Sequence, residues 1–450
     1  MSVDLERAVS RAVDAALAAG ASDADAYGEE TRTRQVRVYG GEVESLSDAG
    51  GRGVGLRAFL DGRSGYAYGT DLREPALREL GRAAVGAAAA ADPDEHDGLP
   101  DEFGASAVEG LRSRELARWS TDRVVELTLA VERAARARPG VTQVETAIYS
   151  DSDASIALAN SRGFASSFSL TRAWAYASAF AGEGTDLMTG LGIGLGRSPA
   201  GLDPDAIGGE AAERALALVG ARQPASRRCP VVLDALVAAS FVGYVGGTLS
   251  ADAVQRGRSL FAGREGAEVA GPALRIADDA TDPEGPASAP FDGEGSPSRR
   301  TPLIERGRLV TFLFDARTAR RAGRATTASA GRSSYRTPPS VGSSNLIVEP
   351  GDEPLERLVE RAGDGVYVTD VAGLHSGVNP VSGTFSVGAS GRLIEGGELG
   401  RPLREMTIAS DLVSMLRAVE AAGSAARWVP FGGSVKAAPL LIAEMAVSGA

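Results

Sequence analysis

Cysteine is nearly absent from this chain, because Cys229 is the only one among 450 residues. A single cysteine excludes an intrachain disulfide framework and is typical of proteins of the reducing cytoplasm. The opening segment, MSVDLERAVSRAVDAAL, also lacks the basic start and the apolar core of a secretory signal. We therefore expect a cytoplasmic location.

Long apolar runs and an excess of positive charge are absent as well. The most apolar window, residues 231–249, contains Asp234 and is rich in glycine and alanine, which favours a buried helix over a membrane span. The chain carries 47 basic and 59 acidic side chains, a net charge of −12 at pH 7. Nucleic-acid grooves need clustered cations with aromatics, and the basic patches at 222–228 and 317–324 are short and lack aromatics. We expect neither a membrane nor a nucleic-acid partner.

Histidine is scarce, with His96 and His375 alone. A zinc site needs three or four His, Cys or carboxylate ligands that converge on one ion. The two histidines and Cys229 occur in three separate sequence contexts. The sequence therefore predicts no catalytic residue, no metal ligand and no cofactor in this chain.

One catalytic alternative stays open at His375, which lies in a Gly-rich stretch with Ser376 and Ser386. No GxSxG elbow frames either serine. A structural histidine in a turn is therefore the favoured interpretation, with an independent hydrolase as the alternative.

The length predicts two domains, with three as the alternative, because 450 residues exceed one ordinary hydrophobic core. A hydrophobic fraction of 43% with 24% charged residues is typical of a globular protein. The polar stretch ARQPASRRCP at 221–230 is the expected boundary, which gives domains at 1–220 and 230–450. The acidic stretch 92–106, with two prolines, is expected to be an exposed linker or flap.

The first half predicts an α+β domain of helices on an antiparallel sheet. Helical periodicity covers 3–19, 73–91, 121–138 and 203–219. Hairpin signals at Gly40 and Gly41, and at Asp61 to Arg63, separate strand patterns. The strands are expected at 35–39, 42–46, 55–60, 64–68, 141–149, 155–160, 165–181 and 187–195. The second half predicts a mainly β domain, with strands at 301–314, 345–349, 365–371, 384–389, 393–395 and 440–447 and a helix at 411–419.

The loop at 278–295, DDATDPEGPASAPFDGEG, carries six carboxylates between prolines and glycines. It precedes an apolar run in which Arg306 and Gly307 predict a turn. The carboxylate spacing does not match that of an EF-hand. We therefore expect Asx-turn hydrogen bonds to organise this loop, and cation binding is the alternative.

This loop is similar to the signature loop of the TldD/PmbA family, the "modulator of DNA gyrase" proteins. The Asn160–Gly163 turn, residues 338–345, the stretch GLHSGVNPVSGTFSVGASG at 373–391 and the last strand also resemble that family. Thr384 departs from the family pattern, which usually has Asp there. In catalytic members an HExxxH zinc helix precedes the loop and a cysteine ligand lies near the C-terminus. The corresponding segments here, 231–247 and 427–436, contain neither, so the chain resembles the PmbA (TldE) type of subunit.

The resemblance implies a non-catalytic subunit of a heteromeric zinc metallopeptidase that processes unfolded peptides, including leader peptides of peptide natural products. The zinc is then expected in a TldD-type partner, and a homodimer is an option for this chain when it is alone. A stand-alone, homo-oligomeric peptide-binding scaffold and the independent hydrolase at His375 remain alternatives. The family-motif positions expected to line a cavity or interface are Asp292, Glu294, Asn345, His375, Asn379 and Ser386.

Overall fold

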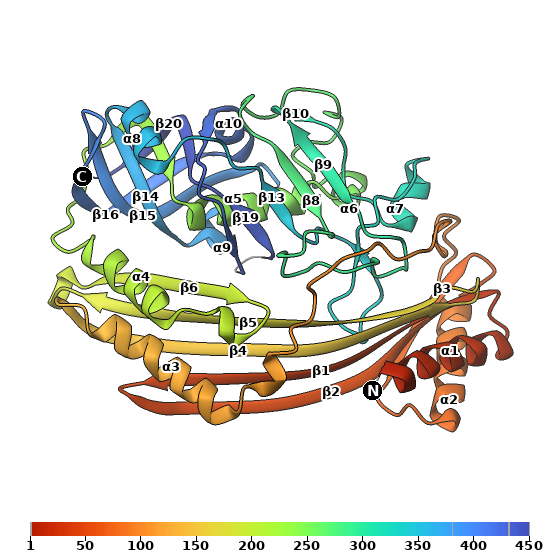
Figure 1. Ribbon diagram of the computed structural model, residues 1–450. Coiled ribbons are helices and arrows are strands. Elements are labelled where there is room, and N and C mark those ends of the chain that lie inside the picture. Colours follow the sequence, from red (N-terminus) through yellow and green to blue (C-terminus); the bar gives the residue numbers. More distant parts are fainter. Residues whose placement is uncertain (1, 380, 431–432, 450) are drawn as a thin grey trace.

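The computed structural model describes residues 2–379, 381–430 and 433–449. The N-terminal half is one long, curved antiparallel sheet with helices against it, and the C-terminal half lies across the sheet and is built mainly of strands (Figure 1). The expected α+β architecture with a mainly β second half is confirmed.

The N-terminal sheet has six strands in the order β3-β2-β1-β4-β5-β6, all pairing antiparallel. Both expected hairpin turns are present. Gly40 and Gly41 have φ of 66° and 81°, and Asp61 and Gly62 have φ of 49° and 70°, which suits two-residue primed turns. The strands are β1 Asp23–Tyr39, β2 Glu42–Leu60, β3 Arg63–Gly69, β4 Val141–Asn160, β5 Ala165–Ala181 and β6 Met188–Gly196.

Three strands are longer than the sequence indicated. β1 begins at Asp23, whereas the prediction began at residue 35, and β2 and β4 each join two predicted strands. Residues 47–53 and 150–154 are rich in Ser, Gly and Asp and predicted breaks, yet β2 and β4 each run through them without interruption. The ladder to β1 continues through both stretches, with Ser47 opposite Gln35 and Ser152 opposite Thr33. Pairing with a continuous neighbouring strand therefore overrides the local turn preference.

Four helices cover one face of this sheet, and each begins and ends within three residues of its predicted position. α1 Ser2–Ala18 and α2 Glu74–Ala90 pack at one end of the sheet, and α3 Thr121–Arg136 and α4 Pro204–Leu216 pack at the other. Side chains of Ser120 and Asp203 cap the N-termini of α3 and α4. Short 3₁₀ turns occur at Leu116–Arg118, Gly184–Asp186 and Pro199–Gly201.

The C-terminal half contains two six-stranded sheets and a two-stranded one. In the sheet β16-β15-β14-β7-β20-β17, an additional pairing of β16 with β20 closes five strands into a barrel. The second sheet has the order β10-β9-β8-β13-β19-β18. The strands are β7 Arg227–Leu233, β8 Ile276–Asp279, β9 Arg300–Glu305, β10 Arg308–Leu309, β11 Ala330–Gly331, β12 Ser340–Val341, β13 Leu346–Val348, β14 Gly365–Ala372, β15 Thr384–Glu395, β16 Glu398–Asp411, β17 Val419–Ala422, β18 Arg427–Val429, β19 Val435–Ala437 and β20 Leu440–Ser448.

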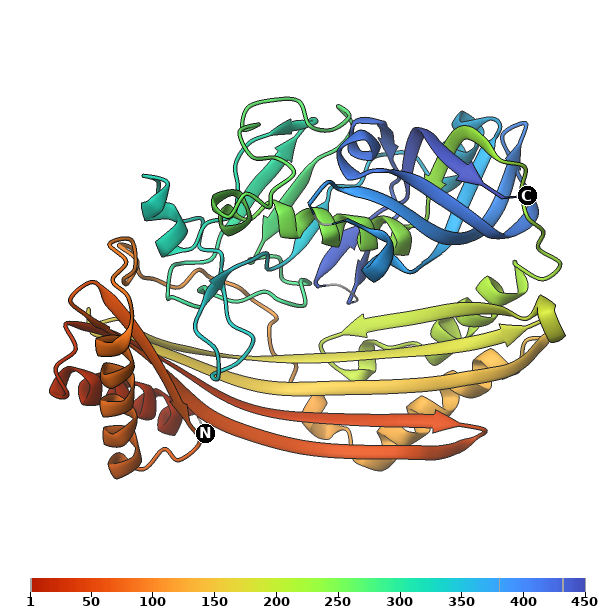
Figure 2. The same ribbon diagram turned by 180° about the vertical axis from the view of Figure 1, so that it is seen from behind.

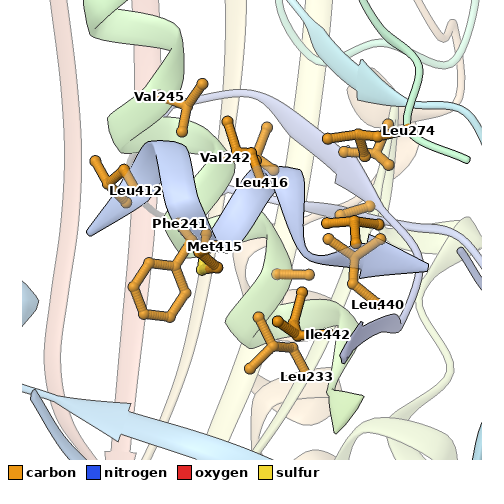
Figure 3. Packing of buried hydrophobic residues seen from close by; sticks show 14 of the residues in the cluster. Leu233, Phe241, Val242, Val245, Leu274, Leu412, Met415, Leu416, Leu440 and Ile442 are labelled. Carbon is orange, nitrogen blue, oxygen red and sulfur yellow. The ribbon is translucent and has the colours of Figure 1, made fainter. Parts of the chain in front are cut away.

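The core of this half forms around helix α5 Ala235–Thr248, a buried helix as expected for the apolar window. The first three residues of that window, 231–233, belong to strand β7 instead. Figure 3 shows Phe241, Val242 and Val245 of α5 directed toward Met415 and Leu416 of α10 Leu412–Arg417. The remaining helices are α6 Ala251–Gln255, α7 Ala316–Arg321, α8 Leu355–Ala362 and α9 Leu374–Gly377. No helix of the described residues is long and apolar enough to cross a membrane.

Some expectations for this half are confirmed and others are corrected. The turn predicted at Arg306 and Gly307 is confirmed, with φ of 46° and 79°, whereas the strand expected at 301–314 is shortened to β9 and β10 on either side of that turn. The patterns at 384–389 and 393–395 belong to one strand, β15, with register shifts against its neighbours. Strand β16 was not predicted, since Gly, Pro and charged residues interrupt its apolar pattern. Helix α8 was also missed, although Leu355, Leu358, Val359 and Ala362 recur at helical spacing.

The stretch 92–106 is not the exposed linker that its composition predicted. It has no regular secondary structure, but Leu99 is fully buried. The backbone N–H of Gly104 donates to Gly295 O (3.1 Å) and that of Ser106 to Pro290 O (2.8 Å). Nη1 of Arg320 donates to His96 O at 2.9 Å. This stretch is therefore a strap that ties the N-terminal half to the 278–295 loop.

Candidate functional site at the junction of the two halves

The 278–295 loop is organised by its own carboxylates, as the sequence predicted. Oδ1 of Asp279, Asp282 and Asp292 each accepts the backbone N–H two residues ahead, at 2.8, 2.8 and 2.9 Å. These are Asx turns. Oδ1 of Asp278 instead accepts the backbone N–H of Ser344 at 2.8 Å, which ties the loop to the chain before β13.

Asn345 fixes the middle of the loop from the C-terminal side. Its side chain is fully buried and satisfies four hydrogen bonds. Nδ2 donates to Asp279 O (2.7 Å) and to Ser288 Oγ (2.9 Å). Oδ1 accepts from Ala287 N (2.9 Å) and from Ser434 Oγ (2.7 Å). A side chain that uses both its donors and its acceptors in this way specifies one conformation of the loop.

Glu294 carries the contact to the N-terminal sheet. Its Oε1 accepts from Nη1 of Arg57 on β2 at 3.0 Å, and its Oε2 accepts the backbone N–H of Ala316 at 2.9 Å. Arg57 also pairs with Asp25 on β1, with Nε donating to Oδ2 at 2.8 Å. Nη2 of Arg332 donates to the second oxygen of Asp25 at 2.8 Å. Charges of alternating sign thus run from one half of the molecule to the other.

Burial shifts the protonation of several acids in this junction. It raises the pKa of Asp292 to about 7, and the nearby Glu294 carboxylate adds to the effect against three backbone N–H donors. Burial also raises the pKa of Glu294, in spite of the opposing charge of Arg57. The pKa of Asp278 is raised to about 7, again mainly by burial.

The loop is held to the N-terminal sheet by further side chains. Nη2 of Arg197 donates to Gly285 O at 2.8 Å, and Nε of Arg172 donates to Pro286 O at 2.5 Å. Phe291 makes edge-to-face contacts with Phe164 and Phe168, with ring centroids 5.5 and 5.2 Å apart. The loop is therefore the connection between the two halves at this end of the molecule.

A second junction joins α4 to the start of α5. Nη2 of Arg214 on α4 donates to Asp234 Oδ1 at 3.0 Å. Asp234 also caps α5 through Leu236 N (3.0 Å) and accepts from Tyr367 Oη (2.7 Å). Arg427 pairs with Glu210, and its Nη2 donates to Ile193 O on β6 at 3.0 Å.

Three of the six predicted site positions, Asp292, Glu294 and Asn345, lie together at the loop junction. The other three, His375, Asn379 and Ser386, belong to the segment 374–395. Asn379 shapes a turn, with its Oδ1 accepting from Val381 N (2.9 Å) and Ser382 N (3.1 Å). His375 and Ser386 are exposed on α9 and β15, and within the described ranges His375 has no hydrogen-bond or ion-pair partner.

Sequence reasoning missed Asp25, Arg57 and Arg332. Asp25 and Arg57 are single charged residues between buried neighbours in strands, and both are themselves buried. An isolated charge inside an apolar strand costs free energy unless a partner compensates it. That pattern was the available signal, although it does not identify the partner.

Three sequence models of one family match the chain. They are described as PmbA/TldA metallopeptidase domain 1 at residues 24–88, central domain at 114–219 and C-terminal domain at 226–449. The chain belongs to the PmbA/TldD family. The resemblance inferred from the sequence is thereby confirmed.

Relatives and solved structures of the PmbA/TldD family match this chain over almost its whole length. Metalloprotease PmbA of Escherichia coli O157:H7 is 28% identical over 99% of this chain and 96% of its own. The PmbA homologue of Haemophilus influenzae is 27% identical with the same coverage. A Thermotoga maritima protein named as a candidate modulator of a DNA gyrase superposes with a TM-score of 0.91 at 25% identity, covering 98% of this chain and 100% of its own. TldE of Thermococcus kodakarensis shares the fold, with a TM-score of 0.90 at 21% identity and the same coverage.

The metal that the name of this metallopeptidase family implies does not fit the residues of this chain's α5. The helix contains no histidine, cysteine or acid, and Asp234, which precedes it, is engaged by Leu236, Tyr367 and Arg214. A zinc ion needs three or four converging donors. Among the residues that the structure describes, no group of three or more His, Cys, Asp or Glu side chains could hold a metal ion.

Proposed function

We propose that this chain is the non-catalytic subunit of a heteromeric metallopeptidase whose catalytic zinc is held by a TldD-type partner. Family membership supports the metallopeptidase part. The observation that carries the rest is the donor set of α5, where Asp234 serves as a helix cap and an ion-pair partner. This chain then supplies structure and binding groups, and the partner supplies the hydrolytic step.

The proposed substrate is an unfolded peptide, such as the leader of a peptide natural product, in the cytoplasm. An extended peptide can be held by main-chain hydrogen bonds along a strand edge, with little demand on its side chains. Two features support this proposal. The N-terminal sheet has long strands, and a buried ion pair between Arg57 and Glu294 joins it to the second half. A subunit without zinc ligands can still contribute a wall and an interface for such a substrate.

A reconstitution with each component left out tests the proposal. Purified TldD-type partner, this chain and an unstructured fluorogenic peptide are mixed, and cleavage is followed with and without a zinc chelator. We expect cleavage in the complete mixture alone, and loss of it with chelator. Full-rate cleavage by the partner without this chain would contradict the proposal and favour the stand-alone scaffold.

The variant His375→Ala separates the hydrolase alternative. His375 is exposed and, among the described residues, its side chain makes no hydrogen bond to a serine and no ion pair with a carboxylate, while the Ser376 hydroxyl donates to Gly373 O, so the geometry does not favour nucleophilic catalysis here. We expect the variant to support the partner's activity at the unchanged rate. Chelator-resistant cleavage by this chain alone that disappears in His375→Ala would establish the alternative instead.

A further inference from the structure

A cavity of about 190 Å³ lies between the two halves, beside the α4 junction. Strand β6 and the end of helix α4 line it from the N-terminal half, and α5, β14 and β18 line it from the C-terminal half. Figure 2 shows β6, in yellow-green, as the strand of the N-terminal sheet nearest to the C-terminal half. The volume equals that of roughly six water molecules at about 30 Å³ each. The cavity therefore has the size of one extended amino-acid side chain.

Most of the cavity wall is apolar. Side chains of both halves contribute to it, namely Leu191, Leu218, Leu236, Val237, Val371 and Val429. Burying methylene groups against such a wall favours binding, because apolar surface leaves water. The wall therefore suits a ligand with an aliphatic stem.

Asp370, near the end of β14, brings an unpaired carboxylate to this cavity. Its side chain is accessible from the cavity, yet the protein around it displaces enough water to raise the pKa of the carboxyl, against the Val371 N–H and the charge of Arg214. Among the described residues, no arginine, lysine or histidine forms an ion pair with it. A cation that enters the cavity would stabilise the ionised form.

The neighbouring ion pairs leave Asp370 as the excess charge. Arg214 pairs with Glu210 at 3.1 Å and with Asp234 at 3.0 Å. Arg427 pairs with Glu210 as well. Two arginines thus face two carboxylates before Asp370 is counted, and Asp370 adds one negative charge without a partner. The cavity therefore attracts a cation rather than an anion or a neutral group.

Two hydroxyl groups complete the set of acceptors. Ser240 Oγ donates to Leu236 O at 2.9 Å, and Thr369 Oγ1 donates to Ser390 O at 3.4 Å. Both hydroxyls line the cavity, and each oxygen keeps lone pairs that can accept a further hydrogen bond. A lysine ammonium has three donors, which this carboxylate and these two hydroxyls can match, whereas the planar guanidinium of arginine has five. The acceptors therefore favour a primary ammonium group.

We propose that the cavity binds the side chain of a lysine in an extended peptide. The methylenes lie against the apolar wall, and the ammonium donates to Asp370, Ser240 and Thr369. This inference rests on the proposed function for the source of the lysine, which is the peptide substrate. The cavity then selects substrates with a lysine at one position, so this chain contributes specificity while the partner performs the hydrolytic step.

Saturation-transfer NMR on the full chain tests the site directly. The probes are a blocked pentapeptide with a central lysine, the same peptide with norleucine in its place, and n-butylamine. We expect saturation of the lysine methylenes, and an affinity at least about tenfold lower for the norleucine peptide, which is the loss that one charged hydrogen bond causes. The free amine should bind more weakly than the lysine peptide, because it lacks a backbone. Equal affinities of the two would make the cavity a site for free amines and overturn the peptide assignment.

The variant Asp370→Asn should lower the affinity for the lysine peptide at least about tenfold, and Asp370→Glu, which keeps the charge, should retain most of it. The matched control is Asp352→Asn, which removes an exposed carboxylate of the same half and should leave the affinity unchanged. Circular dichroism checks that each variant is folded. No saturation transfer at millimolar peptide, equal affinities for the lysine and norleucine peptides, or equal losses in Asp370→Asn and Asp352→Asn would each overturn the proposal.

The reconstituted mixture separates this inference from the proposed function. With the TldD-type partner present, the ratio of kcat/KM for lysine over norleucine peptides should be high with the wild type and fall toward one in Asp370→Asn. Cleavage that requires this chain but shows no preference for lysine would overturn the inference and support the proposed function. Lysine-specific binding without any cleavage in the mixture would support the assignment of the cavity and contradict the proposed function.

Discussion

The two junctions between the halves use the same chemistry in different surroundings. At the loop junction, the side chains of Asp25, Arg57, Glu294 and Arg332 are all 7% exposed or less. At the α4 junction, Arg214, Glu210 and Arg427 are 20–31% exposed. Water therefore screens the charges at the α4 junction, whereas it is excluded from the charges at the loop junction. Removing one partner from a buried ion network costs much folding stability, because a charge is left buried without a partner. Removing one partner from a half-exposed network costs little, because water solvates the remaining charge.

The largest expected effect follows removal of the central cation of the loop junction. In Arg57→Met, Asp25 and Glu294 stay buried and lose their shared partner. We expect the free energy of unfolding to fall by about 3–5 kcal/mol, which is the usual cost of breaking a buried pair. Urea denaturation monitored by circular dichroism measures it.

The matched control is Arg162→Met, which breaks the more exposed pair of Arg162 with Asp23 near the same end of the sheet. A loss of about 1 kcal/mol or less is expected there. Equal losses in the two variants would show that burial does not distinguish these contacts.

The second prediction concerns the pH dependence at Asp278, whose pKa burial raises from 3.8 to about 7. The folded state holds this proton more tightly than the unfolded state does. The resulting stability is fully present below pH 4 and is lost as the pH rises through about 7. The stability of the wild type relative to Asp278→Asn should therefore fall between pH 4 and pH 7, as measured by urea denaturation across that range. A constant difference would contradict the shift.

The smallest effect, of opposite sign, is expected at the α4 junction. Burial tends to raise the pKa of Glu210, but hydrogen bonds and charge from Arg427, with the charge of Arg214, lower it below its ordinary value of 4.5. The ionised Glu210 carboxylate therefore contributes folding stability above pH 4.5, and this stability is lost as the pH falls through the pKa of Glu210 in the folded state. Relative to Glu210→Gln, the wild type should lose stability on acidification, in a manner that added salt weakens. If the two junctions gave pH slopes of the same sign, the contrast between them would fail.

Much of the fold could be predicted from the sequence where local signals agree with the global structure. The four N-terminal helices have clear apolar periodicity, and the Gly40 and Gly41 turn requires positive φ. The Asx turns of the 278–295 loop follow from its Asp residues. These features depend on neighbours within a few residues, so the sequence carries them directly.

The remainder depends on pairing between distant residues. The Ser- and Gly-rich middles of β2 and β4 are strands because β1 lies between them, which no local pattern shows. The site shares this limitation. Glu294 was singled out by its motif, but its partner Arg57 is 237 positions away along the chain. The division at 1–220 and 230–450 stays a prediction. The segments matched by the first two family models, 24–88 and 114–219, both contribute strands to the N-terminal sheet.

That shared sheet has a consequence for how the chain is made. β1 is complete at residue 39, yet its partner β4 spans residues 141–160, so the ladder between them must wait for β4. At about 5–20 residues per second, synthesis of the intervening stretch takes on the order of 5–20 s. During that time the nascent chain presents the unpaired inner edge of β1, whose free backbone groups are a template for pairing with other chains. We expect the ribosome-bound chain to recruit a holdase chaperone until residue 160 emerges, and the released protein to have no such need.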